Sequence, residues 1–223
     1  MSTFELKMVA IVTMIIDHIG LFFFPHIVFL RIIGRISFPL FAFLLANGAI
    51  HTKNINAYLK RLLIFACLSQ IPFLLANRHI SPEFHELNIL FTLFLGLLAI
   101  KYIKKQKTFS MRSLTVALAC LIGALLHVNY GWLGILSIIF FYLCYNHFTQ
   151  TTLSQGGLLL TYALLNPLRT WSLINVAGLA SLIFIFFYNK KEGPRTAYLF
   201  YIFYPAQYVV IFAIQVLIGR VGA

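Results

Sequence analysis

Long apolar runs are the feature that most constrains what this chain can fold into. Runs of about 20 apolar residues recur along the whole sequence, and each is long enough for one helical crossing of a bilayer. Of the 223 residues, 61% are apolar and only 10% are charged, which is unlike a water-soluble domain of this length. A helix satisfies its backbone polar groups internally, as lipid requires. The sequence therefore predicts an all-α, polytopic bundle of transmembrane helices.

Proline, glycine and asparagine residues separate the apolar runs and predict where the helices end. Counting the runs gives about nine transmembrane helices. We expect them at Lys7–Phe24, Ile27–Ile50, Ala57–Ala76, Leu87–Ile103, Ser113–Val128, Trp132–Tyr145, Leu153–Leu165, Leu173–Tyr188 and Ala197–Ile218. Because no long polar linker interrupts the series, we predict a single transmembrane domain covering residues 1–223.

The distribution of lysine and arginine predicts the orientation in the membrane. With a cytoplasmic N-terminus, the inner segments hold Lys7, Lys53, Lys60, Arg61, Lys101, Lys104, Lys105, Lys107, Arg112, Lys190, Lys191 and Arg195, and the outer segments hold Arg78, Arg169 and Arg220. This excess of inner positive charge favours an N-in, C-out protein of a bacterial-type inner membrane, surrounded by lipid. The net charge of +12 follows from this topology, and no basic stripe with interleaved aromatics indicates nucleic-acid binding.

Two further arginines, Arg31 and Arg35, lie inside the second predicted helix. A charge at membrane depth costs at least about 2.5–3.5 kcal/mol, so both arginines need partners or a polar cavity. The short turn at Pro25 makes the first two helices antiparallel neighbours, and a count from it places Asp17, His18 and both arginines in one layer. We expect Asp17 to pair with an arginine and His18 to face a cavity. The alternative is an ion cluster that only pins two helices together.

Other polar residues within or beside the apolar runs indicate a polar cavity, and most of them fall in the first 95 residues. The candidates are Asn47, Gln70, Asn88, Thr92, Tyr201 and Tyr204. Any single pair at helical spacing is more often ordinary interhelical hydrogen bonding than part of a site. The three cysteines are widely spaced within apolar runs, so the sequence predicts neither a disulfide framework nor a metal site.

Several motifs resemble the TraX family of integral membrane proteins. They are L-K-M-V-A-I-V-T-M-I-I-D-H-I-G from Leu6, L-R-I-I-G-R-I-S-F-P-L from Leu30, H-T-K-N from His51, S-Q-I-P-F from Ser69 and Y-L-F-Y-I-F-Y-P from Tyr198. The founding members of that family are implicated in N-terminal acetylation of conjugative pilin, and the family looks like a distant relative of multi-span membrane acyltransferases. This chain departs from the family pattern at Asn129, where an acidic residue is commoner, and at Gln207, where a histidine is expected.

The resemblance implies an acyltransferase that takes an acetyl group from acetyl-CoA as co-substrate, without a metal, and transfers it to an amine or hydroxyl acceptor. The acceptor is a protein N-terminus, a glycan or a lipid. It further implies that His18 is the catalytic base beside Asp17, and that Arg31 and Arg35 are donor or oxyanion contacts. Donor-binding residues at the cytoplasmic end are then His51, Lys53 and Arg61. Two other functions stay open: a transporter or channel with an Asp/His/Arg relay, and a non-catalytic membrane assembly factor.

Overall fold

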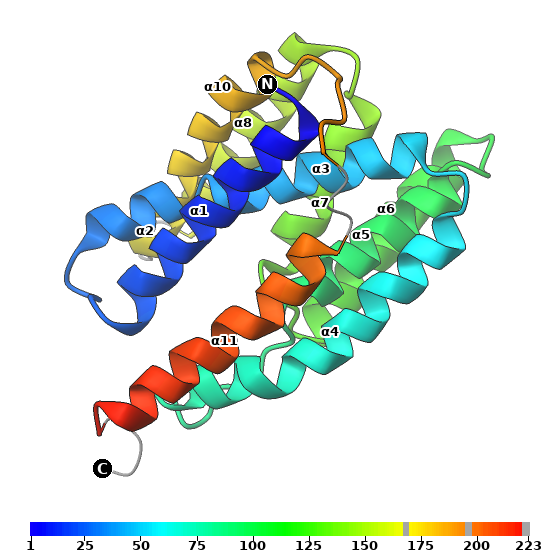
Figure 1. Cartoon of the computed structure of the whole chain (residues 1–223). Coiled ribbons are helices and arrows are strands. Elements are labelled where there is room, and N and C mark those ends of the chain that lie inside the picture. The colour runs from blue at the N-terminus through cyan, green and yellow to red at the C-terminus, as the bar shows by residue number, and fades with distance from the viewer. Residues whose placement is uncertain (167–169, 195–197, 220–223) are drawn as a thin grey trace. The chain divides into compact units, whose positions relative to one another are not determined.

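The structure is a computed structural model that describes residues 1–166, 170–194 and 198–219. Within these ranges the regular structure is helical, and the one β-type pairing is an isolated bridge between Leu87 and Val128 (Figure 1). The prediction of an all-α fold is confirmed. The contacts divide the chain into two compact units, which are described separately, and the single-domain assignment stays a prediction.

The first unit comprises Met1–Thr52 and Leu136–Arg195. Its helices are α1 (Thr3–Phe22), α2 (Val28–Gly34), α3 (Ser37–His51), the later part of α7 (Gly131–Leu143), α8 (Phe148–Leu165), α9 (Thr170–Val176), the 3-10 turn η1 (Ala177–Ala180) and α10 (Ser181–Phe186). Helix α1 packs against both α2 and α3, and α9 and η1 pack against α2. Figure 1 shows α1 and α2 joined by a short turn, as the sequence predicts.

The second predicted helix, Ile27–Ile50, is interrupted after Gly34, so α2 and α3 replace one continuous helix. The physical reason is Pro39 in the first turn of α3. Proline has no N–H, so it cannot donate to the carbonyl four residues earlier, which belongs to Arg35. The interruption therefore falls at Arg35 and Ile36, directly beside the charged residues of the second helix.

The second unit comprises Lys53–Ile135 and Thr196–Ala223. Its helices are α4 (Ile55–Arg78), α5 (Ile89–Ile103), α6 (Phe109–Leu125), the first turn of α7 and α11 (Leu199–Leu217). Asn54, Asn88 and Thr108 accept hydrogen bonds from backbone N–H groups at the starts of α4, α5 and α6. In this unit α4 packs against α5 and α11, and α5 packs against α6. Figure 1 shows α11 running beside α4.

Two other predicted helices differ from the structure. The expected helix Leu153–Leu165 begins earlier, at Phe148, because polar threonine and glutamine residues that an apolar window excludes still form its first turns. The expected helix Leu173–Tyr188 is divided into α9, η1 and α10. Of the remaining expectations, the start of the last helix at Ala197 and the charges of Arg169, Arg195 and Arg220 lie outside the described residues.

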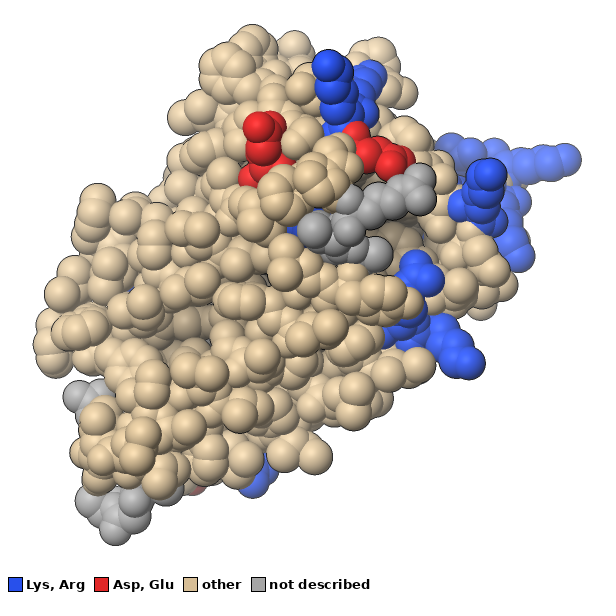
Figure 2. Space-filling view, in the orientation of Figure 1, with Lys and Arg blue, Asp and Glu red and all other residues tan. Residues whose placement is uncertain are grey.

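Three helical segments in the described ranges are long and apolar enough to cross a membrane: Val28–His51, Ile55–Arg78 and Leu199–Leu217. Shorter apolar helices are Ile89–Ile103, Phe109–Leu125, Gly131–Leu143 and Leu173–Phe186. On the face drawn in Figure 2, charged side chains occupy little of the surface. These findings support a helical membrane protein, whereas the nine crossings and the N-in, C-out orientation stay predictions.

Candidate functional site

Asp17 binds both arginines of the second predicted helix. Its Oδ2 atom lies 2.7 Å from Arg31 Nη1, and Arg35 Nη2 lies 2.7 Å from Oδ1 and 2.8 Å from Oδ2. The side chains of Asp17, Arg31 and Arg35 are 13%, 9% and 11% exposed, so little water competes for these contacts. Asp17 therefore forms the expected ion pair with both arginines. We call these three residues the Asp17 cluster.

Two further hydrogen bonds fix the guanidinium groups of the Asp17 cluster. Arg31 Nη1 donates to the backbone carbonyl of Asp17 at 2.9 Å, and Arg35 Nη1 donates to Asn175 Oδ1 at 3.3 Å. Asn175 belongs to α9, far away in the sequence, and the sequence analysis missed it. The signal that could have found it is one amide inside the apolar string L-I-N-V. Both arginines are thus held by several partners in a defined orientation.

Glycines allow the helices to come close enough for these contacts. A Cβ atom added to Gly34 would lie 2.1 Å from Asp17 Oδ1, and one added to Gly20 would lie 2.8 Å from Leu30 Cβ. Any larger residue at Gly34 therefore has to displace the Asp17 carboxylate. This explains why the motifs D-H-I-G and R-I-I-G-R each carry a glycine next to the charged residues.

The Asp17 cluster has two guanidiniums and one carboxylate, and so carries one more positive than negative charge. Charge interactions are stronger in a poorly hydrated site than in water, so this excess favours an anion or a developing negative charge nearby. Two fixed guanidiniums also need little reorganisation when such a charge appears.

His18 lies on the same turn of α1 as Asp17 and is half-buried. Adjacent helical residues point about 100° apart, so the imidazole and the carboxylate face different directions. The His18 ring packs edge-on against Phe22, with 6.0 Å between the ring centroids. Its role as the catalytic base stays a prediction, and the structure places it in the same layer as the Asp17 cluster.

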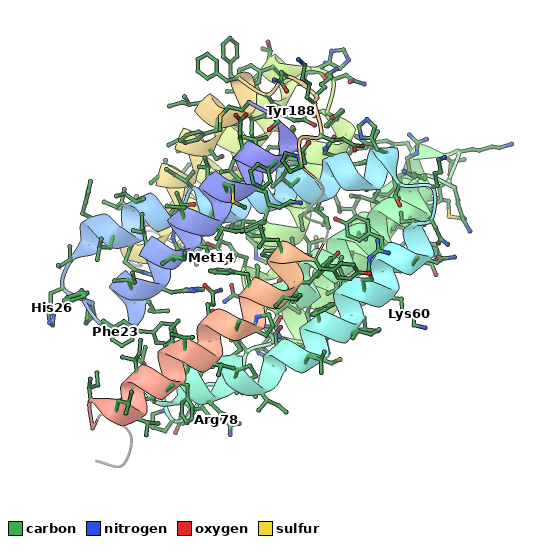
Figure 3. The ribbon with its side chains drawn as sticks, viewed as in Figure 1. Met14, Phe23, His26, Lys60, Arg78 and Tyr188 are labelled. Carbon is green, nitrogen blue, oxygen red and sulfur yellow. The ribbon has the colours of Figure 1, made fainter. Side chains whose placement is uncertain are left out.

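A second polar network of the first unit surrounds Asn47 at the end of α3. Its side chain donates to the Tyr188 hydroxyl at 3.1 Å and accepts from the Tyr145 hydroxyl at 2.5 Å. His51 Nδ1 lies 2.8 Å from the Asn47 carbonyl, and Tyr188 also contacts the Thr3 hydroxyl at 3.0 Å. Figure 3 labels Tyr188 close to the start of α1.

Gln70, Asn88 and Thr92 form a separate network in the second unit. The Asn88 amide donates to Gln70 Oε1 and to the carbonyl of Ala66, both at 2.8 Å, while Thr92 Oγ1 donates to the carbonyl of Asn129. The Asn129 side chain donates to Glu86 Oε2 at 3.1 Å. These residues therefore join α4, α5 and the segment before α7. Asn129, the departure from the family pattern, has a structural partner here.

Arg61 occupies an aromatic environment between α4 and α11. Its guanidinium carbon lies 5.7 Å from the centroid of the Tyr58 ring, and the guanidinium also interacts with the Tyr201 hydroxyl. Tyr201 is 8% exposed and stacks on Phe65 with 5.1 Å between centroids. We call Tyr58, Arg61 and Tyr201 the Arg61 site. Lys53 is exposed before α4.

The predicted site residues thus form several groups. The Asp17 cluster, His18, Asn47 and His51 belong to the first unit, and Gln70, Asn88, Thr92, Arg61, Lys53, Tyr201 and Tyr204 belong to the second. Tyr204 is 2% exposed and packs against Tyr208 with 5.3 Å between centroids. A single cavity lined by all of these residues stays a prediction. In the part of the chain that the structure describes, no three His, Cys, Asp or Glu side chains are placed to hold a metal ion.

The apolar helices indicate a helical membrane protein, and its first unit contains a buried charged site, the Asp17 cluster. The TraX protein family model matches residues 2–215, and the chain belongs to the TraX family. The resemblance seen in the motifs is confirmed.

Two curated proteins are similar in sequence to this chain. A probable fimbrial assembly protein FimC (serogroup H1) of Dichelobacter nodosus is 30% identical, with 94% of each chain covered. An uncharacterized protein of Rickettsia prowazekii (strain Madrid E) is 34% identical over 106 residues, which are 46% of this chain and 38% of the relative. No solved structure matches.

Proposed function

We propose that this protein is a membrane-embedded acyltransferase that moves an acetyl group from acetyl-CoA to an amine or hydroxyl acceptor. In this proposal the chain crosses a bacterial inner membrane about nine times, with the donor on the cytoplasmic side. The observation that carries the proposal is the positively charged Asp17 cluster, held by several partners in the same layer as His18. Membership of the TraX family supports the same reading.

The chemistry assigns one task to each group. His18 accepts the proton of the acceptor amine or hydroxyl as that atom attacks the thioester carbonyl. The carbonyl oxygen gains negative charge, which the guanidinium groups of Arg31 and Arg35 stabilise. The C–S bond then breaks, coenzyme A leaves as the thiolate, and the histidinium returns the proton to its sulfur. Asp17 holds the two guanidiniums in place throughout.

The relatives suggest which acceptor to test first. The Dichelobacter nodosus relative is described as a probable fimbrial assembly protein, and TraX proteins are associated with pilin modification. A fimbrial or pilus subunit offers a free N-terminal amine, which is a good nucleophile once deprotonated. We therefore propose a subunit N-terminus as the leading acceptor, ahead of the hydroxyl of a glycan or lipid.

The test is acetyl transfer by His18→Ala compared with His26→Ala. His26 is an exposed histidine in the turn between α1 and α2, as Figure 3 shows, and serves as a matched control. Both variants are purified and mixed with radiolabelled acetyl-CoA and membranes from cells that lack this protein. Loss of a general base is expected to lower transfer by about 10²–10⁴-fold in His18→Ala, with no change in His26→Ala. Transfer that persists in well-folded His18→Ala removes the proposed base.

The same variants separate the competing functions. If purified protein in liposomes moves protons or anions without consuming thioester, and His18→Ala abolishes that flux, a transporter replaces the enzyme. If neither transfer nor flux occurs while His18→Ala still supports fimbrial assembly in cells, the protein is a non-catalytic assembly factor.

A further inference from the structure

The Arg61 site differs from an ordinary surface arginine because its charge has aromatic neighbours. Tyr58 lies one turn before Arg61 on α4, and Tyr201 reaches the same guanidinium from α11. The guanidinium thus has tyrosine neighbours on two different helices. Tyr201 is held in place by stacking on Phe65. The guanidinium therefore has a restricted orientation while remaining half-buried.

No acidic residue of the second unit balances this charge. The sequence of this unit contains two acidic side chains, Glu83 and Glu86, and both follow the far end of α4 at Arg78. At ~1.5 Å per residue, that end of the helix lies about 26 Å from Arg61 along the axis. Among the described residues the ion pairs are those of Asp17, in the other unit. Arg61 therefore carries a charge that interacts with tyrosines but not with a carboxylate.

The surroundings of Arg61 add positive charge. Lys53 and Lys60 are exposed close by in the sequence, and the first turn of α4 contains no acidic residue. Lys60 and Arg61 lie in the second turn of α4, where no carboxylate offsets their charge. The Arg61 side chain, not the helix end, is the specific element, because it alone is oriented by two tyrosines.

We propose that the Arg61 site binds a phosphate group. The planar guanidinium matches two phosphate oxygens, and the Tyr201 hydroxyl can donate to a third. A phosphate of this kind occurs in coenzyme A and in the headgroup of an anionic phospholipid. The inference rests on the proposed function only in naming coenzyme A as one of these two sources.

The experiment measures binding of two probes to purified protein in neutral micelles. The probes are radiolabelled coenzyme A and dioleoylphosphatidylglycerol, the latter followed by native mass spectrometry. Arg61→Gln is compared with Lys60→Gln. Lys60 is the preceding residue of α4, its side chain is exposed (Figure 3), and its substitution removes the same charge. We expect Arg61→Gln to weaken binding about tenfold or more and Lys60→Gln less than about threefold. Arg61→Lys, which keeps the charge and loses the planar fork, should fall between them.

Each outcome decides the proposal. A selective loss of coenzyme A binding in Arg61→Gln supports the site with the donor as ligand, and a selective loss of lipid binding supports it with a headgroup as ligand. If neither probe binds, or if Arg61→Gln and Lys60→Gln behave alike, the proposal is overturned. All binding is repeated in the His18→Ala background. If the His18→Ala protein still binds the phosphate probes but transfers no acetyl group, the phosphate site and the proposed reaction can be judged independently.

Discussion

The two units bury arginine in two different ways. In the Asp17 cluster, two guanidiniums share one carboxylate at 2.7–2.8 Å, and glycine lets the helix backbones approach. In the Arg61 site, a half-buried guanidinium lies 5.7 Å from an aromatic ring centre and has no acidic partner in its unit. In the first arrangement a carboxylate of the protein binds both guanidiniums and leaves one net positive charge, whereas in the second no carboxylate of the same unit binds the guanidinium.

This difference predicts that substitutions in the two sites change the free energy of unfolding by different amounts. A buried charge whose partner is removed is strongly destabilising, because it cannot return to water without unfolding. A guanidinium over an aromatic ring at a partly exposed site gains only about 0.5–1 kcal/mol. We therefore expect substitutions in the Asp17 cluster to lower the free energy of unfolding as well as the proposed transfer, and substitutions in the Arg61 site to weaken ligand binding with little effect on the free energy of unfolding.

The largest effect is expected for Asp17→Asn. The amide keeps the shape of the side chain but leaves two buried guanidiniums without a counter-charge, which should lower the free energy of unfolding by about 3–5 kcal/mol. Thermal or denaturant unfolding in mild detergent measures the change. Glu192→Gln, which neutralises an exposed carboxylate of the same unit, is the control and should be nearly neutral. A loss below about 1 kcal/mol in Asp17→Asn means that the cluster is solvated rather than buried.

An intermediate effect is expected for Gly34→Ala. The new methyl group would lie 2.1 Å from Asp17 Oδ1, so α1 and α2 have to separate and both ion pairs lengthen. Overpacking of this kind typically costs about 1–3 kcal/mol. Gly157→Ala is the matched control, because a Cβ atom there meets nothing within 4 Å in the middle of α8. That control should be stabilised by about 0.5–1 kcal/mol. Equal effects of the two substitutions would contradict the close approach at Gly34.

The contrast between local and distant contacts also explains what the sequence could predict. Apolar runs and breakers predict the all-α fold, and the short turn at Pro25 allows the depths of Asp17, Arg31 and Arg35 to be compared by counting residues. Helical rise and one tight turn were sufficient for that pairing. The interruption between α2 and α3 could also have been predicted from the sequence, because Pro39 cannot donate a hydrogen bond to the carbonyl of Arg35.

Contacts between distant segments could not be predicted in this way. The bond from Arg35 to Asn175 joins residues 140 positions apart, and the bond from Tyr145 to Asn47 joins residues 98 apart. No turn geometry relates such segments, and a lone polar residue in an apolar run has many possible partners. The division of the polar residues between two units was missed for the same reason, since their crowding in the first 95 residues resembles a single cavity.

The smallest effect on folding is expected for Arg61→Ala, which makes it the sharpest test of the comparison. Removing this guanidinium forfeits its interaction with Tyr58 and Tyr201 and relieves an unbalanced charge, so the free energy of unfolding should change by no more than about 1 kcal/mol. Asp17→Asn, measured beside it without added phosphate or anionic lipid, leaves the guanidiniums of Arg31 and Arg35 without a counter-charge and should cost about 3–5 kcal/mol. A large decrease in the free energy of unfolding in Arg61→Ala would show that contacts within the protein also stabilise this arginine, which would contradict the contrast between the two units.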